Sequence, residues 1–441
     1  MAYNRKQRLN DNIKAIETAF ILDREQRTPT ARERLLLERY CGFGGLKCIL
    51  NPARELADAV HWAKSDLELF APTVELHRLI RENSKNESEY KQLMDSLKQS
   101  VLTAFYTPSA VTEALTDVLK EHQIIPEKVL EPSAGIGAFV DSVLDNNPKA
   151  DIMAFEKDLL TGKILRHLHP EQKVRIEGFE KIEKPFNDYF DLAISNIPFG
   201  DVAVFDPSYT AMKGMRALVT RRIHNYFFVK ALDTVRDGGL VAFITSQGVL
   251  NAKNNSAARF MMLYHADLVS AIRLPNNLFT ENANTEVGSD LIILQKNTQK
   301  ESLRGDDNLL DTVYNDENRI PTNNYFLEHP ERIIHTTAKL DTDPFGKPAM
   351  IYTHEDGVEG IAEDLRKMLH EDFKKNLNLN RYLGIEETKA EEVKEVEETE
   401  KIEKTEKMKP SFEGKQNDTV VSLQKQEKPT DDAELSQKSN H

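Results

Sequence analysis

Long apolar runs and cysteines are both scarce in this 441-residue sequence. No stretch approaches the roughly 20 apolar residues of a membrane span, and the polar start of the chain has no signal core. The cysteines, Cys41 and Cys48, lack the paired spacing of a zinc site. We therefore expect a cytoplasmic protein with reduced thiols, no metal site and no membrane partner. Its oligomeric state stays open.

An excess of positive charge is also missing. The formal net charge of −14 argues at first sight against a polyanionic partner, because Lys and Arg make phosphate contacts. From Ile385 to the end, 16 acidic residues stand against 10 lysines, so this segment supplies −6 of the −14. Phosphate binding depends on local charge, so the remaining −8 leaves room for a basic patch. Residues 385–441 lack sustained apolar heptads, which predicts a disordered charged tail or a solvated single helix.

The spacing of apolar residues divides the rest of the chain into three parts. Residues 1–100 predict a helical N-terminal region, with helices over 32–40, 56–70 and 74–102. Residues 101–300 alternate short apolar strands with amphipathic helices, which predicts a doubly wound α/β fold with a parallel sheet covered on both faces. Residues 301–384 are more irregular and predict a small C-terminal appendage.

A glycine-rich turn follows the first strand expected in that sheet. Gly135 and Gly137 come between the strand-end Glu131 and a helix, where the backbone can approach an anionic ligand closely. Glu156 ends the next strand 19 residues after Gly137, where a carboxylate can accept hydrogen bonds from ribose hydroxyls. A third glycine and a phosphate-binding lysine are missing, so an adenosine-bearing ligand without a pyrophosphate, such as S-adenosylmethionine, fits better. The alternative is a structural turn with a solvated carboxylate.

A second candidate site lies where an apolar run ends in the turn Asn196-Ile197-Pro198-Phe199-Gly200. A buried strand of this kind delivers an amide, a rigid kink and a flat ring to the rim of a pocket. The alternative is a Pro-Phe turn whose ring only packs against the core.

Together these motifs resemble the amino-group methyltransferases that act on adenine N6 in DNA and use an Asn/Asp-Pro-Pro-Tyr/Phe turn. The resemblance covers residues 100–300, with its elements in the order Phe105-Tyr106-Thr107-Pro108, Glu131 to Gly137, Glu156, Gly178-Phe179-Glu180, Asn196 to Phe199, His224 to Phe228, Gly238 to Thr245 and Leu274 to Phe279. It implies a Rossmann-like methyltransferase sheet.

Three further segments are similar to the methylase portion of methylase-helicase proteins of bacterial mobile elements. These are Tyr40 to Leu46, the Asn-x-Pro-Phe-Gly variant of the turn, and Asn323 to Glu331. The likeness implies a modification methylase of the restriction-modification kind. Its partners would be double-stranded DNA and a helicase or specificity protein.

The resemblance also assigns cofactor contacts. Thr107 and Pro108 would border the methionine end of S-adenosylmethionine, and Glu131, Gly135 and Gly137 would line its backbone. Glu156 would bind the ribose. For the adenine the assignment stays open between Phe179 and Glu180, because Phe179 occupies the place of the family's usual acidic residue.

The Asn196 turn would then carry the chemistry. The side-chain oxygen of Asn196 and the carbonyl of Ile197, held by Pro198, would accept both N6 hydrogens and free the nitrogen lone pair. Phe199 would stack on an adenine flipped out of the duplex. Ile197 stands where a proline is commoner, which predicts a looser turn.

Basic residues cluster after this turn, and we expect them to hold DNA phosphates, with a solvated loop as the alternative. They are Lys213, Arg216, Arg221, Arg222 and His224. The sequence thus predicts a methyltransferase that uses S-adenosylmethionine and acts on adenine N6 in DNA. The alternatives are a protein glutamine N5-methyltransferase, which uses a similar turn, and a non-catalytic DNA-binding or anti-restriction protein that retains the fold.

Overall fold

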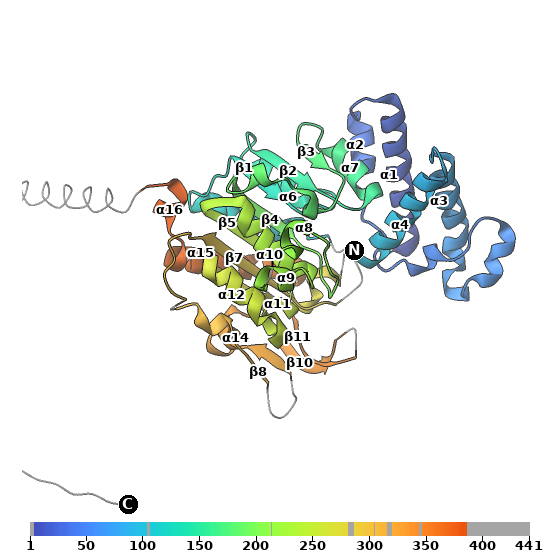
Figure 1. The fold of residues 1–441 in the computed structure, drawn as a ribbon. Coiled ribbons are helices and arrows are strands. Elements are labelled where there is room, and N and C mark those ends of the chain that lie inside the picture. Colours follow the sequence, from blue (N-terminus) through green and yellow to red (C-terminus); the bar gives the residue numbers. More distant parts are fainter. Residues whose placement is uncertain are drawn as a thin grey trace, which may run out of the picture. The chain divides into compact units, whose positions relative to one another are not determined.

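A seven-stranded sheet forms the centre of the protein (Figure 1). The computed structural model describes residues 4–103, 106–212, 214–280, 286–303, 305–314, 320–343 and 346–385. The sheet has the order β3-β2-β1-β4-β5-β7-β6. Its strands are β1 (Lys128–Glu131), β2 (Asp151–Phe155), β3 (Lys173–Arg175), β4 (Phe190–Asn196), β5 (Val235–Ser246), β6 (Ala266–Leu274) and β7 (Ser289–Lys296).

The strands β1 to β5 are parallel, and β7 runs antiparallel to both of its neighbours, β5 and β6. The strand order reverses between β1 and β4, which is the position where open α/β sheets bind ligands beyond the carboxyl ends of their strands. This topology confirms the predicted doubly wound α/β fold.

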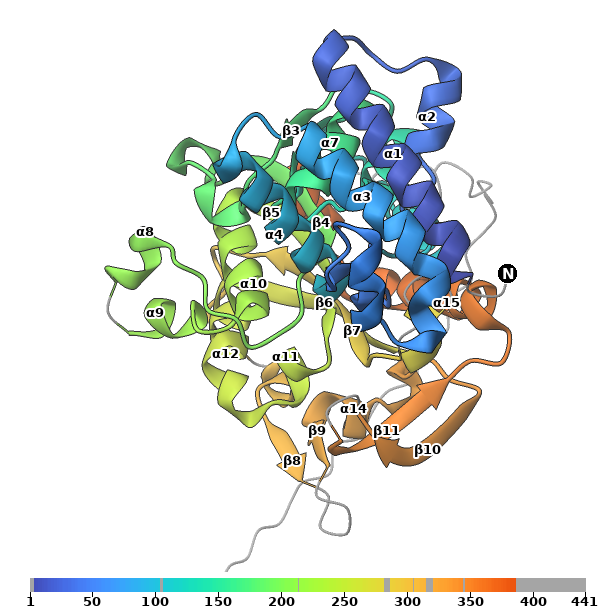
Figure 2. The same ribbon diagram turned by 90° about the vertical axis from the view of Figure 1, so that its right-hand side faces the viewer.

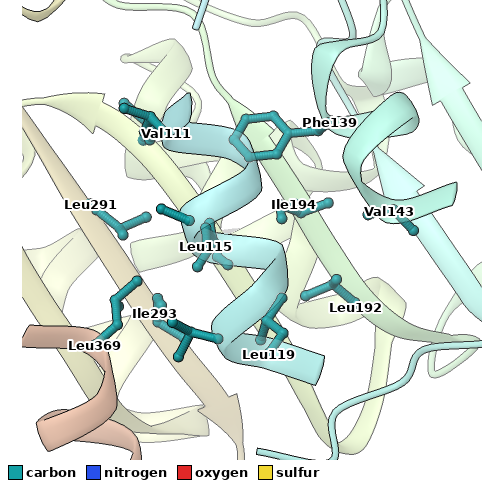
Figure 3. Close-up of a cluster of buried hydrophobic side chains, with 14 of the residues drawn as sticks. Val111, Leu115, Leu119, Phe139, Val143, Leu192, Ile194, Leu291, Ile293 and Leu369 are labelled. Carbon is teal, nitrogen blue, oxygen red and sulfur yellow. The ribbon is translucent and has the colours of Figure 1, made fainter. Parts of the chain in front are cut away.

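Helices cover both faces of the sheet, which is why its central strands are apolar on both sides. One face packs against α5 (Ser109–Glu121), α6 (Ala138–Asn146) and α15 (Gly357–Asn376). Figure 3 shows α5 lying on the sheet, with Leu115 between the strand residues Ile194 and Leu291. The other face packs against α10 (Ile223–Thr234) and α12 (Ser256–His265). Each fully buried leucine in these layers contributes about 1.5–3 kcal/mol.

The N-terminal region contains α1 (Arg5–Glu25), α2 (Ala31–Leu37), α3 (Phe70–Glu82) and α4 (Glu87–Thr103). The single helices expected over 56–70 and 74–102 are wrong in detail. Residues 56–69 form two 3₁₀ helices, η2 (Leu56–His61) and η3 (Lys64–Leu69), and a break at Asn83 separates α3 from α4. This region shares a core with α7 (Leu159–Leu168), which follows β2.

The segment after β7 has two small two-stranded sheets, β8 (Thr312–Tyr314) with β9 (Pro321–Asn323) and β10 (Thr337–Thr342) with β11 (Pro348–Thr353). The described chain also has short α-helices, namely α8 (Pro207–Thr210), α9 (Met215–Val219), α11 (Gly248–Asn251), α14 (Asn324–Glu328) and α16 (Leu379–Leu383). Figure 2 shows α1 and α3 at the top, the β10–β11 hairpin at the bottom and α8 and α9 to the left.

Among the described residues, no helix has the length and apolarity that a membrane crossing requires. The predicted charged tail, beyond Ile385, lies outside the described residues. The domain boundaries expected from the sequence stay predictions.

Candidate active site

The glycine turn lies between the end of β1 and α6. Gly135 and Gly137 have φ angles of 57° and 94°, in the left-handed region that favours glycine. A Cβ atom on Gly135 would lie 2.8 Å from Cε1 of Tyr106, so the Tyr106 ring covers this position closely. Both glycines are therefore required by the backbone and by close packing.

The Glu156 carboxylate connects the glycine turn to the segment that follows β2. One carboxylate oxygen accepts a hydrogen bond from the Gly135 N–H at 2.8 Å, and the other accepts from the Asp158 N–H at 2.7 Å. Burial and, after it, the nearby Asp158 carboxylate together raise the pKa of Glu156 to about 8, against the lowering effect of the backbone donors. Glu156, the residue predicted to bind the ribose, therefore also holds the loop of the glycine turn in place.

Two buried oxygens beside the turn lack hydrogen-bond partners in the described part of the chain. They are Oε2 of Glu131 and Oγ1 of Thr107. Burial raises the pKa of Glu131 well above its usual range, and Asp141 and Glu156 add to the shift. A buried polar atom without a partner costs about 1–3 kcal/mol, so these oxygens fit a ligand that brings hydrogen-bond donors. Pro108 is the N-cap residue of α5, directly after Thr107.

Asn196 is the last residue of β4, and Ser195 before it is bonded to the loop that carries the glycine turn. The Ser195 hydroxyl donates to the Ser133 carbonyl at 3.1 Å. Phe199 is half-buried, and its ring meets that of Phe279 edge to face at a centroid distance of 6.5 Å. The two candidate sites therefore adjoin at the point where the strand order reverses.

Ile197 is not the loose point that the sequence suggested. Its N–H donates to the Ile244 carbonyl at 3.0 Å, which extends the β4–β5 hydrogen bonding by one residue. Its side chain is buried in the core on the α10 side of the sheet. A proline here would lose both the donor and the packing.

Phe179 and Glu180 have different surroundings. The Phe179 ring is 1% exposed and packs against Phe155 and Phe227, so it has almost no surface to offer a ligand. The Glu180 carboxylate folds back over Gly178 and lies 3.8 Å from Lys157 Nζ. The structure does not support a ligand contact for the Phe179 side chain, and Glu180 remains the candidate.

Only part of the predicted basic cluster forms a free basic surface. Lys213 lies outside the described residues. Arg216 makes two hydrogen bonds to Asp233, at 2.6 and 2.9 Å. His224 is buried, which lowers its pKa to about 4 and leaves it neutral. The expected phosphate contacts of Arg216 and His224 are therefore not supported.

The two remaining arginines lie at the start of α10. Arg222 is bound to Asp201 at 2.6 Å, and to the side chains of Asn254 and Asn255 at the same distance. Arg221 is exposed and makes no side-chain hydrogen bond or ion pair with the residues described.

Comparison with known families decides the assignment. The sequence model of a family described as "N-6 DNA Methylase" matches residues 88–391, well over half of the chain. The chain belongs to the N-6 DNA methylase family. In this N-6 DNA methylase, the matched range includes the glycine turn, the Asn196 turn and the whole sheet.

Two curated relatives match parts of this N-6 DNA methylase. The "Defense against restriction protein B" of Escherichia phage P1 is 29% identical over 44% of this chain, and the match covers 8% of that protein. The "Type II methyltransferase M.XamI" of Xanthomonas campestris pv. amaranthicola is 25% identical over 36% of this chain and 33% of its own length. The matches thus span a third or less of both relatives.

Among solved structures, this chain is similar to the type I restriction-modification system methyltransferase subunit from Streptococcus thermophilus. It is 12% identical, covers 85% of this chain and 94% of its own, and has a TM-score of 0.38.

The family implies S-adenosylmethionine as cofactor, and the residues at the glycine turn fit that group. The unpartnered oxygens of Glu131 and Thr107 would provide acceptors for its ammonium and hydroxyl donors. Sequence reasoning missed Tyr106 as part of the site, although it stands in the aromatic-Thr-Pro motif that signalled the region. It also missed the Ser195–Ser133 bond that joins the two turns.

Proposed function

We propose that this N-6 DNA methylase transfers a methyl group from S-adenosylmethionine to N6 of adenine in DNA. The observation that carries the proposal is the junction of the two turns. Asn196 ends β4 and the glycine turn begins at the end of the neighbouring β1, with Ser195 bonded to Ser133 between them. A base at one turn and a cofactor at the other would meet at this junction.

Asn196 and Ile197 would activate the amino group. Adenine N6 is a poor nucleophile because its lone pair is delocalised into the ring. The Asn196 side-chain oxygen would accept one N6 hydrogen and the Ile197 carbonyl the other, which localises the lone pair. The Ile197–Ile244 bond and the buried Ile197 side chain hold the backbone from which this carbonyl projects. A pre-organised acceptor pair needs no reorganisation during the reaction.

Phe199 would stack on the adenine once the base has left the duplex. Unstacking and unpairing a base costs a few kcal/mol, which a ring contact offsets in part. The edge-to-face contact with Phe279 holds the Phe199 ring in place. Pro198 restricts the backbone between the acceptor pair and this ring.

The other turn would hold the cofactor, which supplies the reactive methyl group when bound. Thr107 and Pro108 would border its methionine end, and Glu131, Gly135 and Gly137 would line its backbone. Glu156 would accept from the ribose, and Glu180 would face the adenine.

Double-stranded DNA is the substrate we propose, with Arg221 at the protein–DNA contact and the paired Arg222 beside it. Both arginines stand at the start of α10, and Arg222 is bonded to Asp201, which directly follows the Asn196–Gly200 turn. A helicase or specificity protein stays a partner predicted from the sequence alone.

Methyl transfer from labelled S-adenosylmethionine tests this function. The purified chain is incubated with genomic DNA from cells without adenine methylation, and in parallel with a protein release factor. We expect label in the DNA and none in the protein. Label in the release factor alone would identify a glutamine methyltransferase. Label in neither substrate would favour the non-catalytic DNA-binding protein and contradict the proposal.

A further inference from the structure

A cavity of about 410 Å³ opens beside the start of α10. Its polar lining comes from Asp201, Arg221, Arg222, Asn225 and Asn254. Ligand sites in proteins commonly measure about 300–1,000 Å³, so this cavity can take a group of nucleotide size. Asp201 comes directly after Gly200, which places the cavity next to the Asn196 turn along the chain.

Asn225 gives this cavity a buried acceptor. The residue is 4% exposed, and its Nδ2 donates to Asn255 Oδ1 at 2.9 Å. Asn255 in turn donates from its own Nδ2 to the Gly248 carbonyl at 2.7 Å. These bonds fix which side of the Asn225 amide is the donor. They leave Asn225 Oδ1 buried and without a partner among the described residues.

The charges around the cavity leave one cation available. Arg222 is engaged by Asp201, Asn254 and Asn255. Arg221 also lines the cavity, is exposed and has no carboxylate partner within the described ranges. The cavity thus combines a free guanidinium for an anion with a buried oxygen for an N–H group.

We propose that this cavity binds one nucleotide of the DNA strand next to the target adenine. Arg221 contacts its phosphate, and Asn225 Oδ1 accepts a hydrogen bond from an amino or imino group of its base. The inference rests on the proposed DNA substrate and adds a second nucleotide site to it. The Arg222–Asp201 pair joins the lining of this cavity to the residue that directly follows the Asn196 turn.

Fluorescence anisotropy of a labelled adenine-containing duplex, measured at several salt concentrations, tests the phosphate contact. We expect Arg221→Ala to reduce the salt slope of the binding constant by about one, since one phosphate contact is lost. Arg166→Ala is the matched control, because Arg166 is an exposed arginine on α7 without an ion pair in the described structure. Equal slopes for the wild type and Arg221→Ala would overturn the inference, and so would a lack of duplex binding.

Asn225→Leu tests the base contact in the same assay, with thermal unfolding as the check of folding. We expect binding to weaken roughly five-fold or more at an unchanged salt slope, because the lost contact carries no charge. Wild-type affinity in a folded Asn225→Leu protein would overturn the base contact. A reduced salt slope in Arg221→Ala and weaker binding by Asn225→Leu, in a chain that transfers no methyl group, would refute the proposed reaction and keep this site. Methyl transfer by the wild type, together with unaltered DNA binding in both variants, would support the proposed reaction and refute this site.

Discussion

The buried polar side chains differ between the two edges of the central sheet at which its strands end. At the edge formed by the carboxyl ends of β1 and β5, Glu131 and Thr245 each have a buried side-chain oxygen without a partner in the described chain, as does Ser289 at the start of β7. Buried polar atoms normally find partners in folded proteins. This edge therefore has unmet hydrogen-bonding capacity.

At the opposite edge, Asp191 of β4 and Gln295 of β7 are both hydrogen-bonded through their side chains. The Asp191 carboxylate accepts from the Glu127 and Lys128 N–H groups, both at 2.9 Å, and from Arg236 at 2.7 Å. Gln295 donates to two carbonyls and accepts from the Asn378 N–H. These bonds join β1, β4, β5 and β7 to each other and to the C-terminal helices.

We propose that the contrast separates residues that stabilise the sheet from residues that would pair with a ligand. A satisfied polar group lowers the free energy of the folded chain alone, whereas an unsatisfied one gains its partner only on binding. Substitutions at the two edges should therefore have different consequences.

The largest effect is expected at the carboxyl end of β4. Asn196→Ala removes an acceptor for the N6 hydrogens, so the methyl-transfer rate should fall by at least roughly 100- to 1,000-fold. Cofactor affinity by calorimetry should stay within a few-fold. Asp191→Ala, at the other end of the same strand, is the matched control. It should lower stability by about 1–3 kcal/mol and leave the rate per folded molecule unchanged. Full activity in Asn196→Ala would refute its role.

Ile197→Pro tests whether the turn is held by the core. The substitution restores the commoner residue but removes the hydrogen bond to Ile244 and a buried side chain. We expect the free energy of unfolding, from denaturant titration, to fall by about 2–5 kcal/mol. Ile197→Val keeps the N–H and should cost about 0.5–1.5 kcal/mol. A proline variant as stable as the wild type would show that the turn is not anchored in this way.

Glu156→Ala should weaken S-adenosylmethionine binding by about 1–3 kcal/mol, since it removes an acceptor and the carboxylate that holds Gly135. Glu156→Gln keeps one acceptor and should bind better than the alanine variant. Calorimetry measures both. Unchanged affinity in Glu156→Ala would remove this residue from the cofactor site.

A smaller effect is expected from pH. Ribose hydroxyls donate to the ionised carboxylate, and the free protein holds the Glu156 proton up to a pKa of about 8. Binding must release this proton below that pH. Affinity should rise with pH by at most about tenfold per unit and level off above pH 8. Glu156→Gln should flatten this rise. A wild-type profile that falls as pH rises toward 8 would contradict the assignment.

Sequence reasoning located what depends on neighbouring residues in the chain. Apolar runs predicted the strands, and the turns at Gly135 and Asn196 predicted both halves of the site, because strand ends and glycine turns have local signals. The N-terminal 3₁₀ helices were missed, since short 3₁₀ and α segments share similar apolar spacing.

Contacts between distant residues could not be predicted in the same way. The pairing of Arg216 with Asp233 and the burial of His224 depend on how α9 and α10 pack. The anchoring of Ile197 depends on the β4–β5 register, which a single sequence does not reveal. Tertiary packing thus decided which of the basic residues stay free and how rigid the turn is.

The most direct test of the account is the identity of the methylated atom. Adenine-unmethylated DNA is incubated with the purified chain and S-adenosylmethionine, digested to nucleosides and analysed by mass spectrometry. The account predicts N6-methyl-2′-deoxyadenosine with the wild type and almost none with Asn196→Ala. Methylation of a different base, or equal amounts of product from both proteins, would contradict it.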